Sequence, residues 1–267
     1  MRQVGKNMRR LANLVLPLLL VMASCSTVEY DLVETASVQP KFRDTDPQDF
    51  GPKTPHHHAV HGIDVSKWNG DIDWRRVKAS GVSFAFIKAT EGKDRVDPKF
   101  SENWRGASAA GVAQAPYHFY YFCSTADEQA NWFISNVPKE SSYLPPVLDV
   151  EWNGESKNCR YRPSKETAVL ELQRFLDRLE AHYGKRPIIY TSVDFHRDIL
   201  VGEFKRYHFW LRSVANHPNN VYEDRRWAFW QYTSTGVIPG IDGSTDINVF
   251  AGTRKNWQNW VASVSGG

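Results

Sequence analysis

The sequence has little net charge, few cysteines, no internal repeat and no apolar run long enough to cross a membrane. Its 33 basic and 30 acidic residues give a formal net charge of +3, which indicates no electrostatic binding of nucleic acid or of another anionic polymer. The N-terminal apolar run, Leu11 to Met22, is too short to span a bilayer as a stable helix. The composition, 41% hydrophobic and 24% charged over 267 residues, indicates one large globular domain or two small ones.

Residues 1–25 have the layout of a bacterial lipoprotein signal peptide. Basic residues precede the apolar run, which ends in Met22-Ala23-Ser24-Cys25 and resembles a lipobox there. Cleavage at that point would leave Cys25 as a lipidated N-terminus. We therefore expect an exported protein, anchored on the periplasmic or cell-surface side of a membrane. An ordinary cleaved signal with an incidental cysteine is the alternative. Residues 1–25 hold four basic and no acidic residues, so the formal net charge without them is about −1.

The three cysteines are consistent with one lipidated residue and one disulfide. Lipid on Cys25 would leave Cys123 and Cys159 as a pair in an oxidising compartment. Each of the two lies just beyond a predicted strand, so both could sit at the same rim of the fold. The alternative is two free buried thiols.

Residues 26–60 lack clear periodicity and are rich in Asp, Pro, Thr and His. This composition predicts a tether between the anchor and a domain that occupies residues 61–267. The run His56-His57-His58 has no cysteine or carboxylate spacing that would make a closed metal site, so we interpret it as part of a solvated linker.

From His61 onward, strand and helix patterns alternate. Strands are predicted over 60–65, 82–90, 112–122, 144–152, 186–191, 207–214, 227–233 and 245–250, and helices over 73–80, 97–111, 125–137, 164–184 and 253–261. The helix boundaries rest on Asp97 before Pro98, on a capping box of Thr125 with Glu128, and on Ser164. Five βα units followed by three strands predict an α/β fold, a modified TIM-like barrel with an incomplete helical coat.

The strand Leu144 to Trp152 carries two acids near its end. Side chains alternate faces along a strand, so Asp149 and Glu151 point the same way while Leu148 and Val150 point the other way. Burial of an unpaired carboxylate costs several kcal/mol, and two neighbouring carboxylates push their pKa values apart. The pair therefore indicates either a cationic partner or a catalytic acid beside an ionised neighbour. The alternative is a strand end whose acids are solvated or cap a following helix.

Barrel geometry brings further polar and aromatic residues to the same rim, because active sites lie at the C-terminal ends of barrel strands. The candidates at strand ends are Asp64, Lys88, Thr90, Glu91, Tyr117, His118, Tyr120, Tyr190, Trp230, Tyr232 and, early in the last strand, Asp246. We expect at least three acids and several aromatic side chains to share one cleft. Aromatic rings can stack on sugars, although core packing is the alternative for Tyr117, Tyr190 and Trp230.

Five motifs together resemble family 25 glycoside hydrolases, the Chalaropsis-type lysozymes or N-acetylmuramidases. They are His61-Gly62-Ile63-Asp64-Val65-Ser66, Phe86-Ile87-Lys88-Ala89-Thr90-Glu91-Gly92, Tyr117-His118-Phe119, Asp149-Val150-Glu151 and Trp230-Gln231-Tyr232. The resemblance covers about residues 60 to 262, in the family's order and spacing. It implies a modified barrel of five βα units and three strands, as the alternating pattern does.

The resemblance implies a role for each acid. Glu151 matches the catalytic acid that protonates the leaving glycosidic oxygen, and Asp149 matches its partner, which orients and stabilises the 2-acetamido group of the substrate. Asp64 and Asp246 match the remaining acids of the cleft, Asp246 on a weaker motif. Tyr117, Tyr190 and Trp230 are the candidates for substrate binding. The chain departs from the family at Trp210-Leu211-Arg212, where Trp-Ile-Ala is frequent.

The implied reaction is cleavage of the β-1,4 bond between N-acetylmuramic acid and N-acetylglucosamine in peptidoglycan. The resemblance favours a substrate-assisted route with net retention, whereas Cα atoms about 6.5 to 7 Å apart along the strand do not decide between retention and inversion. No metal or organic cofactor is implied, and we expect a monomer. The alternatives are a peptidoglycan-binding lipoprotein that lost activity and a hydrolase of another N-acetylated glycan such as chitin.

Overall fold

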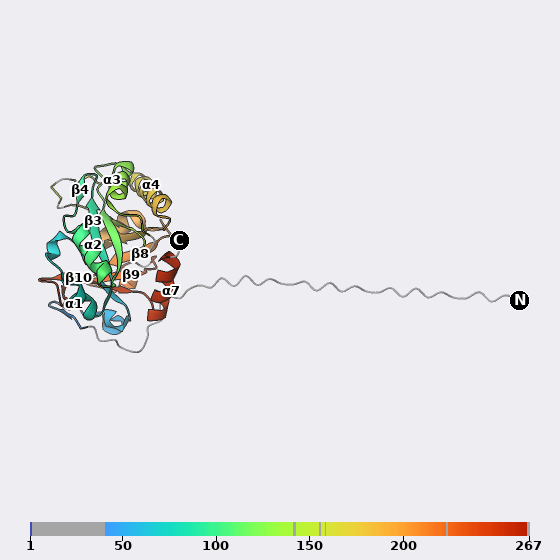
Figure 1. The fold of residues 1–267 in the computed structure, drawn as a ribbon. Coiled ribbons are helices and arrows are strands. Elements are labelled where there is room, and N and C mark those ends of the chain that lie inside the picture. The colour runs from blue at the N-terminus through green and yellow to red at the C-terminus, as the bar shows by residue number, and fades with distance from the viewer. Residues whose placement is uncertain (2–40, 141–142, 155, 158, 223, 266–267) are drawn as a thin grey trace.

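The computed structural model describes residues 1, 41–140, 143–154, 156–157, 159–222 and 224–265 (Figure 1). Eight strands form the barrel: β2 (His61–Val65), β3 (Val82–Glu91), β5 (Ala113–Phe119), β6 (Val147–Val150), β7 (Ile188–Thr191), β8 (His208–Arg212), β9 (Phe229–Val237) and β10 (Thr245–Phe250). Two short strands, β1 (Arg43–Asp44) and β4 (Arg95–Val96), pair at its margins with β9 and β3. The longer helices are α1 (Trp74–Ala79), α2 (Phe100–Ala109), α3 (Ala126–Asn136), α4 (Lys165–Tyr183) and α7 (Arg254–Ser265).

The eight strands close into a barrel, which confirms the predicted fold class. They pair in the order β2-β3-β5-β6-β7-β8-β9-β10, and β10 pairs in turn with β2. Every pairing from β2 to β9 is parallel, whereas β10 is antiparallel to both neighbours. The first residues of β10 therefore lie at the same rim as the last residues of the other strands.

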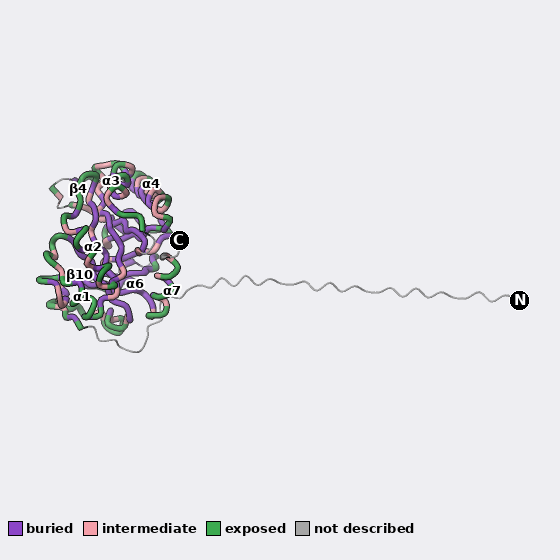
Figure 2. The backbone as a smooth tube through the Cα atoms, viewed as in Figure 1, coloured by how far each residue is buried: buried purple, intermediate pink, exposed green. Residues whose placement is uncertain are grey.

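The inner face of the barrel is polar at the rim, where the parallel strands end, and aromatic toward the opposite end. Phe86 stacks on Trp210 with ring centroids 4.1 Å apart. Trp257 of α7 packs against Phe84 with ring centroids 5.3 Å apart and closes the barrel at the end opposite the rim. Gly62 has no side chain because a Cβ atom there would lie 2.3 Å from the Phe84 ring. In Figure 2 the buried segments of the backbone, in purple, lie toward the centre of the domain, and the exposed segments, in green, lie toward its outside.

The helices cover the outer face of the barrel unevenly. The capping box of Thr125 with Glu128 starts α3, and Ser164 caps α4, as predicted. At α2 the structure differs from the prediction, because the helix begins at Phe100 and Asp97 accepts hydrogen bonds from the backbone N–H groups of Lys67 and Lys99 instead. Between β7 and β9 the helices in the described part of the chain are short: α5 (Val193–Phe195), a π-helical turn over residues 196–200, and α6 (Pro218–Val221). The predicted incomplete coat is thus present.

Residues 41–60 belong to the folded domain, whereas the sequence indicated a tether up to Val60. Arg43 pairs with Val237 of β9, the Phe50 ring packs edge-on against Trp230 at 4.9 Å, and Val60 is fully buried. A few apolar side chains pack this segment against the barrel, and because they are not regularly spaced, no periodic pattern marks the segment in the sequence. Cys25 and the rest of residues 2–40 lie outside the described residues.

The described residues contain neither a membrane-spanning helix nor a cluster of metal-ligating side chains. In this part of the chain no helix has both the length and the apolar character that crossing a membrane requires. Among the same residues, no three His, Cys, Asp or Glu side chains come together in a way that could hold a metal ion.

Candidate active site

Asp149 and Glu151 lie at the C-terminal end of β6, on the inner face of the barrel. Asp149 is flanked in register by Phe119 of β5 and Tyr190 of β7. It is buried, and its Oδ1 atom has no hydrogen-bond partner among the described residues. Burial, and then the charge of Glu151, raise the pKa of Asp149 well above its usual value. Burial also raises the pKa of Glu151, which is partly exposed. Burial therefore favours the protonated form of both carboxyl groups.

Asp64 and Asp246 form a second acid pair across the rim. The antiparallel register of β2 and β10 makes them Cα partners. Burial raises the pKa of Asp64 to about 6 and that of Asp246 to about 8, and the charge of Asp64 adds to the effect on Asp246. Asp246, second in its strand, reaches the rim only because β10 runs opposite to its neighbours. The structure thus brings together all four acids that the sequence singled out.

A chain of amide side chains holds Asp64 in place. Its Oδ2 atom accepts hydrogen bonds from Gln231 Nε2 and Asn248 Nδ2, each 2.9 Å long. The Gln231 amide oxygen accepts from the Tyr190 hydroxyl at 3.0 Å, and the Asn248 amide oxygen accepts from Trp210 Nε1 at 2.7 Å. These hydrogen bonds orient the side-chain amides of Gln231 and Asn248 and so position the Asp64 carboxylate.

Gln231 and Asn248 were missed as functional residues by sequence reasoning. Gln231 stands inside the quoted motif Trp230-Gln231-Tyr232, Asn248 lies two residues after Asp246, and each alternates with apolar neighbours along its strand. A polar side chain on a strand whose neighbours are apolar was the available signal.

Two cations approach the acids from opposite sides of the rim. Lys88, on β3, forms a 2.8 Å ion pair with Glu91 and lies 4.6 Å from the centroid of the Phe119 ring. Arg212 is the last residue of β8. Positive charge on Arg212 and Lys88 opposes the effect of burial on the pKa of Glu151. The acids of the cluster are therefore flanked by two cations, whose charge favours the ionised form of Glu151.

The chain that carries this site matches a known protein family. The profile described as Glycosyl hydrolases family 25 matches residues 63–241, more than half of the chain. The chain belongs to family 25. It is 37% identical over 223 residues to YegX of Escherichia coli K12, an uncharacterized protein, covering 80% of this chain and 78% of YegX. It is also 35% identical over 206 residues to Lysozyme M1 of Streptomyces globisporus, covering 73% of this chain and 69% of that protein.

Two solved structures have the same fold as this chain. A family 25 glycosyl hydrolase from Bacillus anthracis superposes with a TM-score of 0.71 at 35% identity, over 82% of this chain and 99% of that one. A bacterial lysozyme from Streptomyces coelicolor gives a TM-score of 0.68 at 33% identity, over 78% of this chain and 98% of that one. As a member of family 25, the chain is a glycoside hydrolase.

The aromatic candidates divide between the two faces of the barrel. Tyr117 and Tyr190 point inward, and after burial the charges of nearby acids, Asp64 and Asp149 among them, raise the pKa of Tyr117 further. Trp230 points outward, is fully buried, and donates its indole N–H to the Ser213 carbonyl at 2.8 Å. It has no free face for a sugar ring, so the expectation that Trp230 binds substrate is corrected. Its strand neighbour Gln231 faces the site instead.

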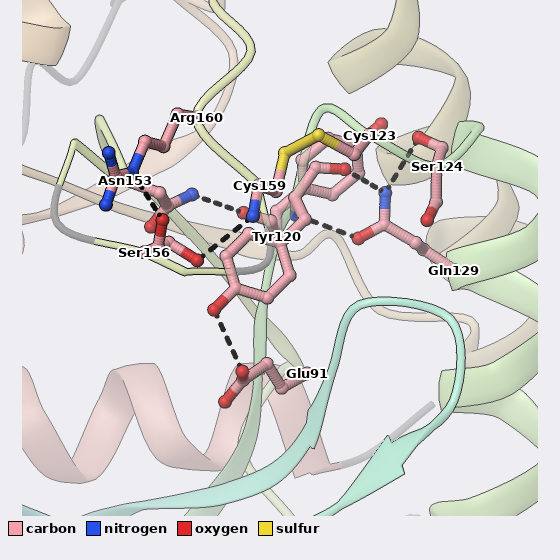
Figure 3. Close-up of a disulfide and its surroundings, with 10 residues drawn as sticks. Glu91, Tyr120, Cys123, Ser124, Gln129, Asn153, Ser156, Cys159 and Arg160 are labelled. Atoms are coloured by element: carbon pink, nitrogen blue, oxygen red, sulfur yellow. Dashed lines mark hydrogen bonds between the residues drawn. A yellow bond between two sulfur atoms is a disulfide. The ribbon is translucent and has the colours of Figure 1, made fainter.

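A disulfide joins two loops at the rim of this family 25 enzyme. Cys123, after β5, and Cys159, after β6, are bonded with their Cα atoms 5.7 Å apart, as the sequence predicted (Figure 3). The neighbouring Tyr121 hydroxyl donates to Glu91 Oε1 at 2.9 Å, and Glu91 in turn pairs with Lys88. The bridge is thus connected to a cation of the site through one tyrosine and one glutamate.

Proposed function

We propose that this family 25 hydrolase cleaves the β-1,4 bond between N-acetylmuramic acid and N-acetylglucosamine in peptidoglycan. Lysozyme M1 of Streptomyces globisporus and the Streptomyces coelicolor lysozyme, both at least 33% identical to the chain, support this substrate. Glu151 is the general acid on the leaving oxygen, and Asp149 assists the 2-acetamido group of the sugar, whose carbonyl oxygen attacks the anomeric carbon. This route gives net retention.

The unpartnered Oδ1 atom of Asp149 is the observation that supports this assignment most directly. A buried carboxylate oxygen without a donor costs about 1 to 3 kcal/mol or more, so a ligand that supplies a donor is favoured. The N–H of a 2-acetamido group is such a donor. A hydrogen bond from it orients the acetamido oxygen toward the anomeric carbon, which is bonded directly to the leaving oxygen that Glu151 protonates.

Substrate binding would also place the catalytic proton. In the free protein, burial and the charge of Glu151 raise the pKa of Asp149 well above its usual value, and burial raises the pKa of Glu151 as well. A substrate N–H donated to Asp149 stabilises its ionised form, while a sugar that covers the partly exposed Glu151 raises the pKa of Glu151 further. Both effects favour the proton on Glu151, where the leaving oxygen needs it.

The second acid pair would hold the sugar. Ionised Asp64, fixed by Gln231 and Asn248, accepts hydrogen bonds from sugar hydroxyl groups. Asp246 is able to donate one, because its pKa is raised to about 8 by burial. Tyr117, on the inner face among these acids, and Tyr190, which positions Gln231, complete the wall. We propose no metal or organic cofactor.

Product analysis tests the proposal. The purified protein is incubated with peptidoglycan and, separately, with chitin oligomers, and new reducing ends are reduced with borotritide and identified after hydrolysis. Labelled muramicitol from peptidoglycan is expected. Labelled glucosaminitol as the main product, cleavage of chitin alone, or binding of peptidoglycan without cleavage would overturn the proposal. Proton NMR of the first-formed anomer distinguishes retention from inversion.

We also propose that the mature chain is a monomer held at the membrane by lipid on Cys25. Cys25→Ser should move the protein from detergent-extracted membranes to the soluble periplasmic or secreted fraction. Mass spectrometry of the mature N-terminus checks the same point independently. An unmodified Cys25, or a mature chain that starts elsewhere, would contradict it.

A further inference from the structure

Arg212 is a cation at the rim to which the proposed reaction assigns no role. It ends β8 two residues beyond Trp210, whose indole bonds to Asn248 inside the barrel, so the Arg212 side chain starts from the same inner face. Its register partner on β9 is Gln231, which holds Asp64. Strand geometry therefore directs the guanidinium into the opening that the acids share.

The guanidinium is not neutralised by a contact partner. Lys88 is paired with Glu91 at 2.8 Å, whereas the Arg212 side chain makes no hydrogen bond and no ion pair within 4.0 Å in the described part of the chain. Its charge nevertheless lowers the pKa of Glu151 and of Asp246 against the effect of burial. The group is thus near the acids but keeps its five N–H donors unused.

The backbone beneath Arg212 is fixed while its side chain is half-buried. The Tyr222 hydroxyl lies 2.7 Å from the Arg212 carbonyl oxygen and 3.2 Å from that of Thr191, and the next residue, Ser213, donates its N–H to Gln231 at 3.0 Å. A guanidinium without a partner on a fixed backbone is suited to bind a group that arrives from solution, because the backbone loses little conformational entropy on binding.

The chemistry of that group follows from the guanidinium. A planar fork of N–H donors matches a carboxylate in a bidentate pair. A muramyl residue carries a carboxylate on its lactyl substituent, either free or extended by a peptide stem with carboxylates of its own, whereas N-acetylglucosamine carries none. We propose that Arg212 binds such a carboxylate and selects anionic muramyl glycans. This inference rests on the proposed function.

Four substrates test the inference on the full mature chain. Glycan strands freed of peptide by an amidase carry lactyl carboxylates, and a matched batch has them converted to methylamides. Intact peptidoglycan carries stem carboxylates, and its matched batch is methylamidated in the same way. The measurement is the ratio of kcat/KM for the anionic and the neutral member of each pair. A ratio of about ten or more is expected in one pair for the wild-type protein, and the pair that shows it identifies the source of the carboxylate.

Variants then assign the preference to Arg212. Arg212→Gln should reduce the ratio to about one and Arg212→Lys should retain part of it, because a point charge replaces a bidentate fork. Arg105→Gln, an exposed site on α2, is the control for net charge and should keep the full ratio. A wild-type ratio near one in both pairs, or an unchanged ratio in Arg212→Gln with both rates lowered alike, would overturn the inference while leaving the proposed function intact. If the wild-type protein cleaves none of the four substrates, the proposed function itself is wrong.

Discussion

Asp64 and Asp246 face each other across the antiparallel pairing of β2 and β10, at the rim of an otherwise parallel barrel. Two buried acids on neighbouring strands repel each other when both are ionised. Gln231 and Asn248 direct two donors to Asp64, and so the ionised form is assigned to Asp64 and the protonated form to Asp246. This division makes the pair sensitive to pH.

Asp246→Asn should change how stability depends on pH. Burial and the charge of Asp64 raise the pKa of Asp246 from 3.8 to about 8, so the folded state holds a proton that the unfolded state releases. The resulting stability is fully present below pH 3.8 and is lost as pH rises through about 8. The melting temperature of Asp246→Asn minus that of the wild type should therefore rise between these two values. Asp242→Asn, at an exposed loop position, is the matched control for the change of side chain. A difference for Asp246→Asn that does not rise with pH would refute the shift.

Glu151→Gln should abolish turnover but not glycan binding. The amide keeps the shape of the side chain and loses the transferable proton, which lowers kcat about 100-fold or more. Turnover is measured on purified peptidoglycan, and binding by co-sedimentation with it. The melting temperature serves as the folding control. Near-normal lytic activity in a folded Glu151→Gln variant would remove Glu151 from its role.

The barrel and the acid cluster could be predicted because local signals and topology agree. Thr125 and Ser164 have the side chains of helix caps and so predicted two helix starts. Parallel strands place their C-terminal ends at one rim, and this rule predicted from the sequence that Asp64 and Asp149 lie together. Asp246 was predicted from its motif. It lies at the start of its strand and still reaches the rim of the site because β10 is antiparallel to its neighbours.

Which face of β9 points inward could not be predicted in the same way. Alternation shows that Trp230 and Tyr232 share one face and Gln231 the other, but not which face is inside. An aromatic face usually packs in a core and a polar one faces water. Here the outer face is covered by residues 41–60, with Phe50 against Trp230, and the inner face at the rim is polar because it forms the site. The missing information was a contact between distant segments.

Trp230→Phe should therefore reduce stability rather than substrate affinity. The variant loses the 2.8 Å hydrogen bond to Ser213 and leaves a buried carbonyl and a small cavity, at a cost of about 1 to 3 kcal/mol. Thermal or urea unfolding measures this cost, and KM on peptidoglycan should stay unchanged. Trp210→Phe is the matched control, since its indole supports Asn248 and its loss should lower activity. A raised KM in Trp230→Phe with normal stability would restore the original expectation.

Removal of the rim disulfide should lower stability more than it lowers the rate of the chemical step. Cys123 and Cys159 are 36 residues apart, and loop-closure entropy for a loop of this size corresponds to about 4 kcal/mol. Cys123→Ser with Cys159→Ser should therefore melt several degrees lower than the wild type. Neither sulfur is assigned a contact with substrate, so kcat well below the melting temperature should change little. In a Cys25→Ser background, thiol titration of the denatured protein without reductant should find no free thiol. Two free thiols, or an unchanged melting temperature in the double variant, would refute the bridge as a stabilising element.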